Sequence, residues 1–233
     1  MNINGVIFLC VTNMSMSNMF MVVNLFCAEI PIFLREHHDG MYSTLAYFIS
    51  KQLVELPLLF IKPIIFASII YFMVGLNESS ERFAYFLLIL ELLTQCAVSF
   101  GYFVSCLAAT PQIAMAIAAP LMIPFMLFGG FFINDKTIPG WIDWMKYLSW
   151  FKYGNEALMI NQWAGLRLGC PAPSISQLIG IAEPCFATGE QVLHMFGFEK
   201  ENLHLNIICL VALIVGFKTI AFFSLLSKTI RRK

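Results

Sequence analysis

The stretch FAYFLLILELLTQCAVSFGYFVSCLAATPQIAMAIAAPLMIPFMLFGGFFIN, residues Phe83 to Asn134, carries a single formal charge, Glu91, in 52 residues. A helix needs about 20 apolar residues to cross the hydrocarbon core of a bilayer, so this run fits two crossings. Residues 109–112 (ATPQ) interrupt the run, and Pro111 disfavours helix at the residue before it. The stretch therefore predicts two membrane helices joined by a tight turn.

The composition of the whole chain agrees with an integral membrane protein. Hydrophobic residues make up 59% of the 233 residues, charged residues make up 12%, and the mean hydropathy is +0.78. Soluble domains carry about 25% charged residues. The 14 basic and 14 acidic residues cancel, so no basic surface is predicted for nucleic acid. We expect the lipid bilayer to be the main surroundings of this chain.

Five apolar segments predict the fold class, an all-α polytopic membrane protein with five transmembrane helices and short extracellular or interfacial helices. The first segment has no charge up to residue 28, no basic residues before it and no clear cleavage site after it, which favours a membrane helix over a cleaved signal. The segments cover residues 3–28, 45–76, 83–108, 113–133 and 205–226.

The basic carboxyl tail predicts the orientation. Short cytosolic flanks are enriched in Lys and Arg, and the chain ends with Lys228, Arg231, Arg232 and Lys233. Counting back through five crossings places the connection Arg35–Ser43 in the cytosol. Residues 134–204 then face outward.

The outward segment, residues 134–204, is rich in aromatic residues. All four tryptophans fall between residues 141 and 163. Such a pattern predicts short helices at the headgroup level, with the rings embedded and the charges in water. A compact lid whose aromatic rings pack among themselves is the alternative. The residues at helical spacing are Trp141, Trp144, Leu148 and Phe151.

Two of the seven cysteines, Cys170 and Cys185, lie in this outward segment and flank a stretch that contains Pro, Ser and Gly. A disulfide that closes a loop of about 15 residues stabilises a protein by ~3 kcal/mol in the chain-entropy model. We predict an intramolecular bridge, with free thiols or a bridge between two subunits as alternatives. The other five cysteines lie in apolar runs and are interpreted as small buried hydrophobic residues.

Charged residues also occur within the predicted membrane helices. Lys51 and Glu55 are four residues apart near the cytosolic end of the second helix. Lys62 and Glu91 lie deeper and at similar depths, where a lone charge costs ~3 kcal/mol. We predict that Lys62 and Glu91 pair, or that each faces a watery cavity. A pair could simply dock two helices without a direct role in transport.

No motif predicts catalysis. The chain contains no phosphate-binding G-x-x-x-x-G-K-[ST] loop and no zinc-type spacing of Cys and His. We therefore expect no catalytic residue, no metal site and no cofactor in this chain.

Four strings occur in a fixed order: REHHDGMY (35–42) continuing into YFISK (47–51), ELPL (55–58), PFMLFGGFFIN (124–134) and YLSWFKYGNEALMINQW (147–163). Together they resemble the membrane domain of G-subfamily ABC transporters, and especially the half-transporter group of the insect eye-pigment proteins White, Scarlet and Brown. The resemblance implies that residues 1–233 form a partial ABC-2 type transmembrane domain. It lacks the family's nucleotide-binding domain and first membrane helix, so the chain resembles a fragment, a truncated gene product or a chain that needs partners.

The resemblance also implies roles for individual residues. In that family a coupling helix after the first helix present here rests on the nucleotide-binding domain, which would bind ATP and Mg. Arg35, Glu36, Gly40 and Tyr42 match this element. Substrates pass through a cavity on the two-fold axis of a dimer, which the first and fourth helices line. The matching cavity residues are Asn13, Met16, Ile123 and Met126, and Phe131 and Phe132 match the pair that plugs the outer exit.

The function implied is the membrane-spanning portion of an ATP-driven half-transporter for a small-molecule pigment precursor, either a tryptophan metabolite or a purine. It would work as a homodimer or a heterodimer in the plasma membrane, or in a pigment-granule or other intracellular vesicle membrane. Two alternatives remain: a sterol or lipid transporter of the same subfamily, and a truncated regulatory subunit that does not transport.

Overall fold

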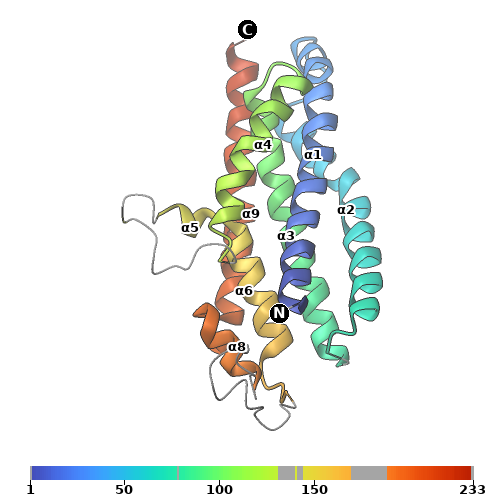
Figure 1. Ribbon diagram of the computed structural model, residues 1–233. Coiled ribbons are helices and arrows are strands. Elements are labelled where there is room, and N and C mark those ends of the chain that lie inside the picture. The colour runs from blue at the N-terminus through green and yellow to red at the C-terminus, as the bar shows by residue number, and fades with distance from the viewer. Residues whose placement is uncertain (1, 78, 131–139, 141–143, 169–187, 232–233) are drawn as a thin grey trace.

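A computed structural model describes residues 2–77, 79–130, 140, 144–168 and 188–231 as a bundle of long helices (Figure 1). Four helices are long and apolar enough to cross a membrane, and a fifth apolar helix, α4, is shorter. The protein is therefore an all-α, multi-pass integral membrane protein. The long helices are α1 (Asn2–His38), α2 (Thr44–Val74), α3 (Ser80–Leu107) and α9 (Leu203–Arg231), and α4 covers Pro111–Leu127.

Shorter helices follow α4 in the chain. Helix α5 projects from the side of the bundle, whereas α8 lies at the end opposite the carboxyl terminus (Figure 1). Within the described residues the only β-type pairing is an isolated bridge between Arg167 and Thr188. The short elements are α5 (Met145–Leu148), α6 (Trp150–Trp163), α8 (Gly189–Phe196) and the 3-10 helix η2 (Lys200–Asn202).

Local sequence signals explain where the membrane helices begin and end. The Ser43 hydroxyl accepts a hydrogen bond from the Ala46 amide at 3.3 Å and caps the start of α2. Gly75, with φ of 68°, ends α2 in the left-handed conformation that glycine adopts without strain. Thr110 caps α4 and Pro111 occupies its first turn, where proline is favoured.

Three predicted helix ends are wrong by five residues or more. Helix α9 continues to Arg231 rather than ending at residue 226. Helix α1 continues to His38 rather than ending at residue 28, because Pro31 is accommodated within the helix and the first glycine that can stop it is Gly40. Helix α4 ends at Leu127 rather than at residue 133, since Gly129 and Gly130 follow and Gly130 has φ of 74°. Only residues 39–43 separate α1 from α2.

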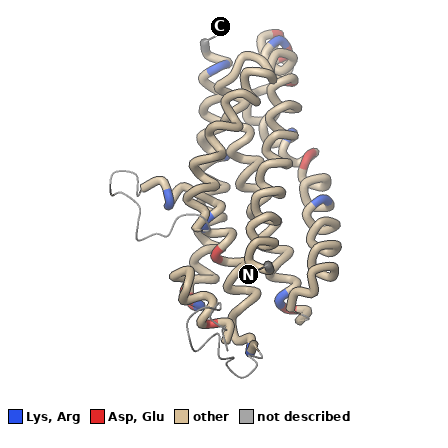
Figure 2. The backbone as a smooth tube through the Cα atoms, viewed as in Figure 1, with Lys and Arg blue, Asp and Glu red and all other residues tan. Residues whose placement is uncertain are grey.

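The helices place different connections at the two ends of the bundle, which can be compared with the orientation predicted from the basic residues. The α1–α2 corner and the carboxyl terminus lie at one end, and the α2–α3 turn and α8 lie at the other (Figure 1). Charged residues lie at both ends of the bundle, and others lie along α2 and at the side of the bundle near α5 (Figure 2). The corner and the end of α9, which carries Lys228 and Arg231, therefore lie at the same end of the bundle, as the predicted orientation requires.

Helix α3 is the centre of the bundle, and α6 is inserted beside it. Helix α3 packs against α1, α2, α6 and α9, and α6 also contacts α1 and α9. The fully buried Trp150 starts α6 and places its ring centroid 5.2 Å from Phe100 of α3, 5.0 Å from Phe125 of α4 and 5.8 Å from Phe217 of α9. The first turn of α6 thus joins three other helices.

The burial of α6 corrects the prediction for the outward segment. The sequence placed Trp144 and Phe151 together on one interfacial face, but Trp144 is 61% exposed and Phe151 is fully buried. Tyr147 is 59% exposed, with the Lys146 ammonium 5.0 Å from its ring centroid. The segment therefore divides into an exposed α5 and an α6 that belongs to the core, while Trp141 lies outside the described residues.

Polar contacts fasten both ends of α6. The Ser149 hydroxyl donates to the Phe125 carbonyl at 2.6 Å, and the Trp163 indole donates to Asn4 Oδ1 at 2.8 Å. The Arg82 guanidinium donates to the carbonyls of Asn161, at 2.6 Å, and of Ala164. A cation at the carboxyl end of a helix satisfies free carbonyls and complements the helix dipole.

Replacing Trp150 with Ala should destabilise the protein by about 3–5 kcal/mol, because the substitution opens a cavity where α3, α4, α6 and α9 meet. Trp144→Ala is the matched control, and it should change the free energy of unfolding by less than about 0.5 kcal/mol since that ring is largely exposed. Thermal or denaturant unfolding in detergent measures both. Equal effects of the two substitutions would show that α6 is not part of the core.

Candidate functional site

The α1–α2 corner is held by contacts between its own residues. Gly40 has φ of 76°, which lets the chain turn immediately after α1. The Tyr42 hydroxyl donates a hydrogen bond back to the Glu36 carboxylate, and a ring nitrogen of His37 lies 2.9 Å from the Tyr42 carbonyl. Arg35 is exposed. The structure thus brings Glu36, Gly40 and Tyr42 together and leaves Arg35 free to meet another surface.

Tyr42 is neutral in this corner at physiological pH. Partial burial of the ring, together with the hydrogen bond to Glu36 and the charge of that carboxylate, raises the pKa of Tyr42 to about 12. A raised pKa means that the contact with Glu36 is complete below the ordinary tyrosine pKa of about 10 and is lost as the pH rises towards 12. The corner therefore keeps its geometry over the physiological range.

A network of charged and phenolic groups connects this end of α1 to α2 and α3. Lys51 Nζ lies 2.6 Å from Glu29 Oε2 and 2.9 Å from Glu55 Oε1, and the side chains of Lys51 and Glu55 are only 12% and 11% exposed. The Tyr102 hydroxyl of α3 donates to Glu55, and the Tyr47 hydroxyl lies 3.4 Å from Glu29. One ammonium thus bridges two carboxylates on neighbouring helices.

The sequence predicted only part of this network. The Lys51–Glu55 pair is confirmed as an i,i+4 contact. Glu29 was missed because the first helix was predicted to end one residue before it. The charge of Glu29 could have predicted its role, since a carboxylate inside a continuing membrane helix needs a cationic partner.

Aromatic stacking supports the same end of the bundle. The Phe33 ring of α1 stacks on Tyr47 of α2 with a centroid distance of 4.2 Å, and Tyr42 lies 6.1 Å from both rings. Such stacked pairs add about 0.5–1.5 kcal/mol beyond the area they bury. The stacked rings therefore join the corner to the adjoining ends of both helices.

Asn13 and Met16, which were predicted to line a substrate pathway, lie on one face of α1 and line the same groove. The groove has a volume of about 710 Å³, and its other wall is α2, through Phe66, Ile70 and Val74. Asn13 is exposed and Met16 is half-buried. No α4 residue lines this groove, so in this chain the two residues face α2.

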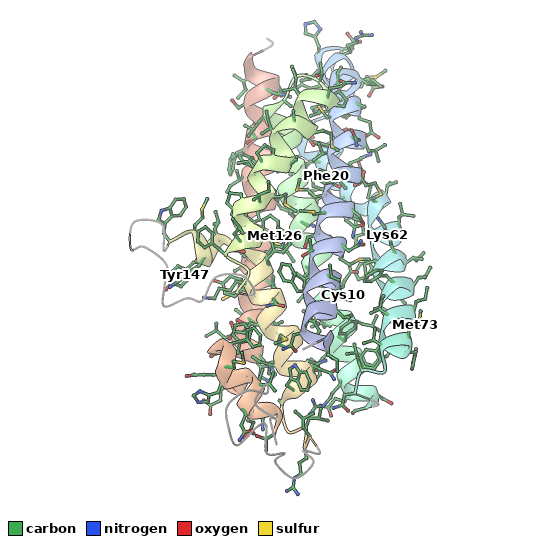
Figure 3. The ribbon with its side chains drawn as sticks, in the orientation of Figure 1. Cys10, Phe20, Lys62, Met73, Met126 and Tyr147 are labelled. Atoms are coloured by element: carbon green, nitrogen blue, oxygen red, sulfur yellow. The ribbon has the colours of Figure 1, made fainter. Side chains whose placement is uncertain are left out.

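The predicted pathway residues of α4 lie elsewhere on the surface. Ile123 is 49% exposed, whereas Met126 is half-buried and packs against the core. Figure 3 shows Met126 and Lys62 on opposite sides of α1. Helices α1 and α4 are in contact, but their predicted residues do not converge on one pocket. Phe131 and Phe132 lie outside the described residues.

The predicted pairing of Lys62 with Glu91 is wrong, and the alternative, that each faces a watery cavity, stays a prediction. Lys62 reaches from α2 to α1, where its Nζ donates to Ser17 Oγ at 3.2 Å and to Asn18 Oδ1 at 2.9 Å. Glu91 instead accepts a hydrogen bond at 2.9 Å from Gln95, one turn further along α3. The two side chains are directed at different neighbours, and similar depth does not imply contact.

The cysteines within the helices are free thiols. Cys10, Cys27, Cys96 and Cys106 are buried, as predicted from their apolar surroundings, and Cys209 is half-buried. Cys170 and Cys185 lie outside the described residues. Within the described part of the chain, no group of three His, Cys, Asp or Glu side chains could hold a metal ion.

The chain matches the ABC-2 type transporter family over residues 1–163, which include α1 to α6. The protein therefore belongs to this family of membrane domains. The match covers both the α1–α2 corner and the buried α6, so it rests on the elements described above.

Curated relatives match along nearly the whole chain. Protein white from Drosophila melanogaster is 38% identical over all 233 residues, which are 33% of its own length. The ABC transporter ATP-binding protein/permease wht-1 from Caenorhabditis elegans is 36% identical over 98% of this chain and 34% of its own length. Protein scarlet from Drosophila melanogaster is 32% identical over 96% of this chain and 33% of its own length. The chain spans about a third of these relatives.

Lys51→Met should lower the free energy of unfolding by about 3 kcal/mol, because it leaves the largely buried Glu55 carboxylate and the partly exposed Glu29 carboxylate without their cation. Arg35→Met at the same end of the bundle should have an effect below about 0.5 kcal/mol, since that side chain is exposed. Lys51→Arg should recover most of the loss. Unfolding of the three variants in detergent is the measurement, and a Lys51→Met protein as stable as Arg35→Met would contradict the network.

Proposed function

We propose that this chain is the membrane-spanning portion of an ATP-driven half-transporter and contributes the substrate pathway for a pigment precursor, either a tryptophan metabolite or a purine. The observation that carries the proposal is 38% identity to Protein white along all 233 residues. A relative named as an ATP-binding protein and permease supports the coupling of transport to ATP. The chain itself would supply the pathway and the corner, and a nucleotide-binding domain would supply ATP hydrolysis.

The α1–α2 corner is the proposed contact with the nucleotide-binding domain. The Tyr42–Glu36 hydrogen bond and the left-handed Gly40 hold the corner in one shape, while Arg35 is available for a partner surface. The Lys51 network and the stacked Phe33 and Tyr47 rings join this corner to α2 and α3. A push on the corner would therefore tilt α1 and α2 together.

The proposed pathway needs a second subunit. Asn13 of α1 and Ile123 of α4 are both exposed in a single chain, although they do not share a pocket. A partner half-transporter that packs against α1 and α4 would place four helices around one axis. Met16 and Met126 would then offer flexible, polarisable walls that suit aromatic ligands. Phe131 and Phe132 are proposed to close the outer exit.

The substrate proposal is tested by uptake into vesicles that contain the complete gene product together with the subunits that hydrolyse ATP. Radiolabelled kynurenine, guanine and cholesterol are compared with and without ATP. ATP-dependent movement of kynurenine or guanine supports the proposal. Movement of cholesterol alone would assign the chain to sterol transport, and ATP-independent retention of all three would indicate a regulatory subunit.

In the same vesicles, Glu36→Ala should reduce ATP-dependent uptake about tenfold, since it removes a hydrogen bond to a charged group that shapes the corner. Tyr42→Phe should have the same effect, because the two side chains share one contact. Asp39→Ala is the control: this exposed acid lies in the same corner, and among the described residues its side chain pairs with His38, at 3.8 Å. Normal uptake by the Glu36→Ala protein, at an unchanged protein level, would contradict a role of the α1–α2 corner in coupling.

A further inference from the structure

The groove between α1 and α2 combines an apolar wall with polar groups. Its volume of about 710 Å³ lies within the range of small-molecule sites, about 300–1,000 Å³. The rings of Phe20 and Phe66 line it from opposite helices. Thr12, Asn13 and Ser17 add hydroxyl and amide groups on the α1 side. The groove can therefore hold a ring and also bond to a polar substituent.

Lys62 does not itself line this groove, but its side chain contacts a residue that does. It precedes Phe66 by one helical turn, and its Nζ donates to Ser17, which itself lines the groove. Figure 3 shows the Lys62 side chain between α2 and α1, at a level between Phe20 and Cys10. The Asn18 amide group is oriented by its own hydrogen bond to the Met14 carbonyl at 2.8 Å, so its oxygen faces the ammonium.

The ammonium of Lys62 has a donor to spare. An ammonium group has three N–H donors, and the described residues accept two of them. Both acceptors are neutral, and no carboxylate of the described residues forms an ion pair with Lys62. By contrast, Lys51, on the same helix, forms ion pairs with two carboxylates. A positive charge at mid-depth without a counter-ion is costly, so an anion that enters the groove would be stabilised there.

We propose that the α1–α2 groove binds an aromatic monocarboxylate, whose carboxylate accepts the third N–H of Lys62 while its ring lies against Phe20 and Phe66. One ammonium with one free donor suits a single negative charge. A phosphate would call for more donors, of the kind that arginine or a helix amino terminus supplies. The proposal concerns binding alone and does not rest on the transport proposed above.

The test compares two ligands that differ in charge. Indole-3-acetate and its uncharged analogue indole-3-acetamide are bound to the intact protein in phosphatidylcholine nanodiscs, and both dissociation constants are measured at equilibrium. The wild-type protein should bind the acid at least tenfold more tightly than the amide. Lys62→Met should weaken binding of the acid about ten- to a hundredfold, the value of one charge-assisted hydrogen bond, and leave binding of the amide unchanged. Lys62→Arg should retain binding of the acid.

Lys218→Met is the matched control, because Lys218 is another half-buried lysine in a membrane helix, α9, and does not line the groove. It should bind both ligands like the wild-type protein. Equal affinity of the wild-type protein for acid and amide would overturn the proposal, and this comparison requires no variant to fold. Absence of acid binding, or unchanged acid binding in a folded Lys62→Met protein, would also overturn it.

Discussion

The rest of the bundle depends on the burial of α6, a helix too short to cross a bilayer. Backbone polar groups have no water to bond with in the hydrocarbon core, so a short helix can lie at membrane depth only where protein surrounds it. Here the Arg82 guanidinium donates hydrogen bonds to backbone carbonyls at the carboxyl end of α6, and Asn4 accepts a hydrogen bond from the Trp163 indole. Trp150 fills the space at the other end. These partners come from α1, α3, α4 and α9, so the contacts of α6 fix the positions of these four helices relative to one another.

Close packing around α6 and α3 explains why glycine is used there. A Cβ on Gly154 of α6 would lie 2.3 Å from the Leu93 side chain of α3, so any larger residue would require that side chain to move. A Cβ on Gly101 of α3 would lie 3.2 Å from the Met19 carbonyl of α1. Small residues that let helices approach closely are typical of membrane interfaces, where van der Waals packing replaces the hydrophobic effect. The part of the bundle where α6 meets α3 is thus a closely packed unit.

The opposite half is built differently, from charge and stacked rings rather than from close backbone approach. Glu29, Lys51, Glu55 and Tyr102 connect three helices below the α1–α2 corner. Helix α2 contributes few buried residues along its middle, and the groove with Lys62 opens there. A helix fixed by polar contacts at the end next to the α1–α2 corner and loosely packed at its centre can tilt, which is the movement that the proposed coupling requires.

Hydropathy and charge predicted the membrane class, the positions of the long helices and the shared face of the corner and the basic tail, because each depends on local composition. An apolar run marks a membrane helix, and Gly or Pro marks its ends, so both signals can be read within a single segment. The position of α6 could not be predicted, since the string WFKYGNEALMINQW fits an interfacial helix as well as a buried one. The partners of Lys62 and Glu91 could not be predicted either. The rotation of a helix about its axis decides which neighbour a side chain contacts, and that rotation depends on packing between segments. Glu29 was missed through a misplaced helix end.

Hydrogen exchange of α6 followed by mass spectrometry, on the protein in nanodiscs, tests the central claim most directly, since exchange reports how each backbone amide is protected. If α6 is held within the bundle, peptides from residues 150–163 will exchange as slowly as those of α3. Exchange as fast as that of α8, at the exposed end of the bundle, would contradict the buried position of α6 and the fold built around it.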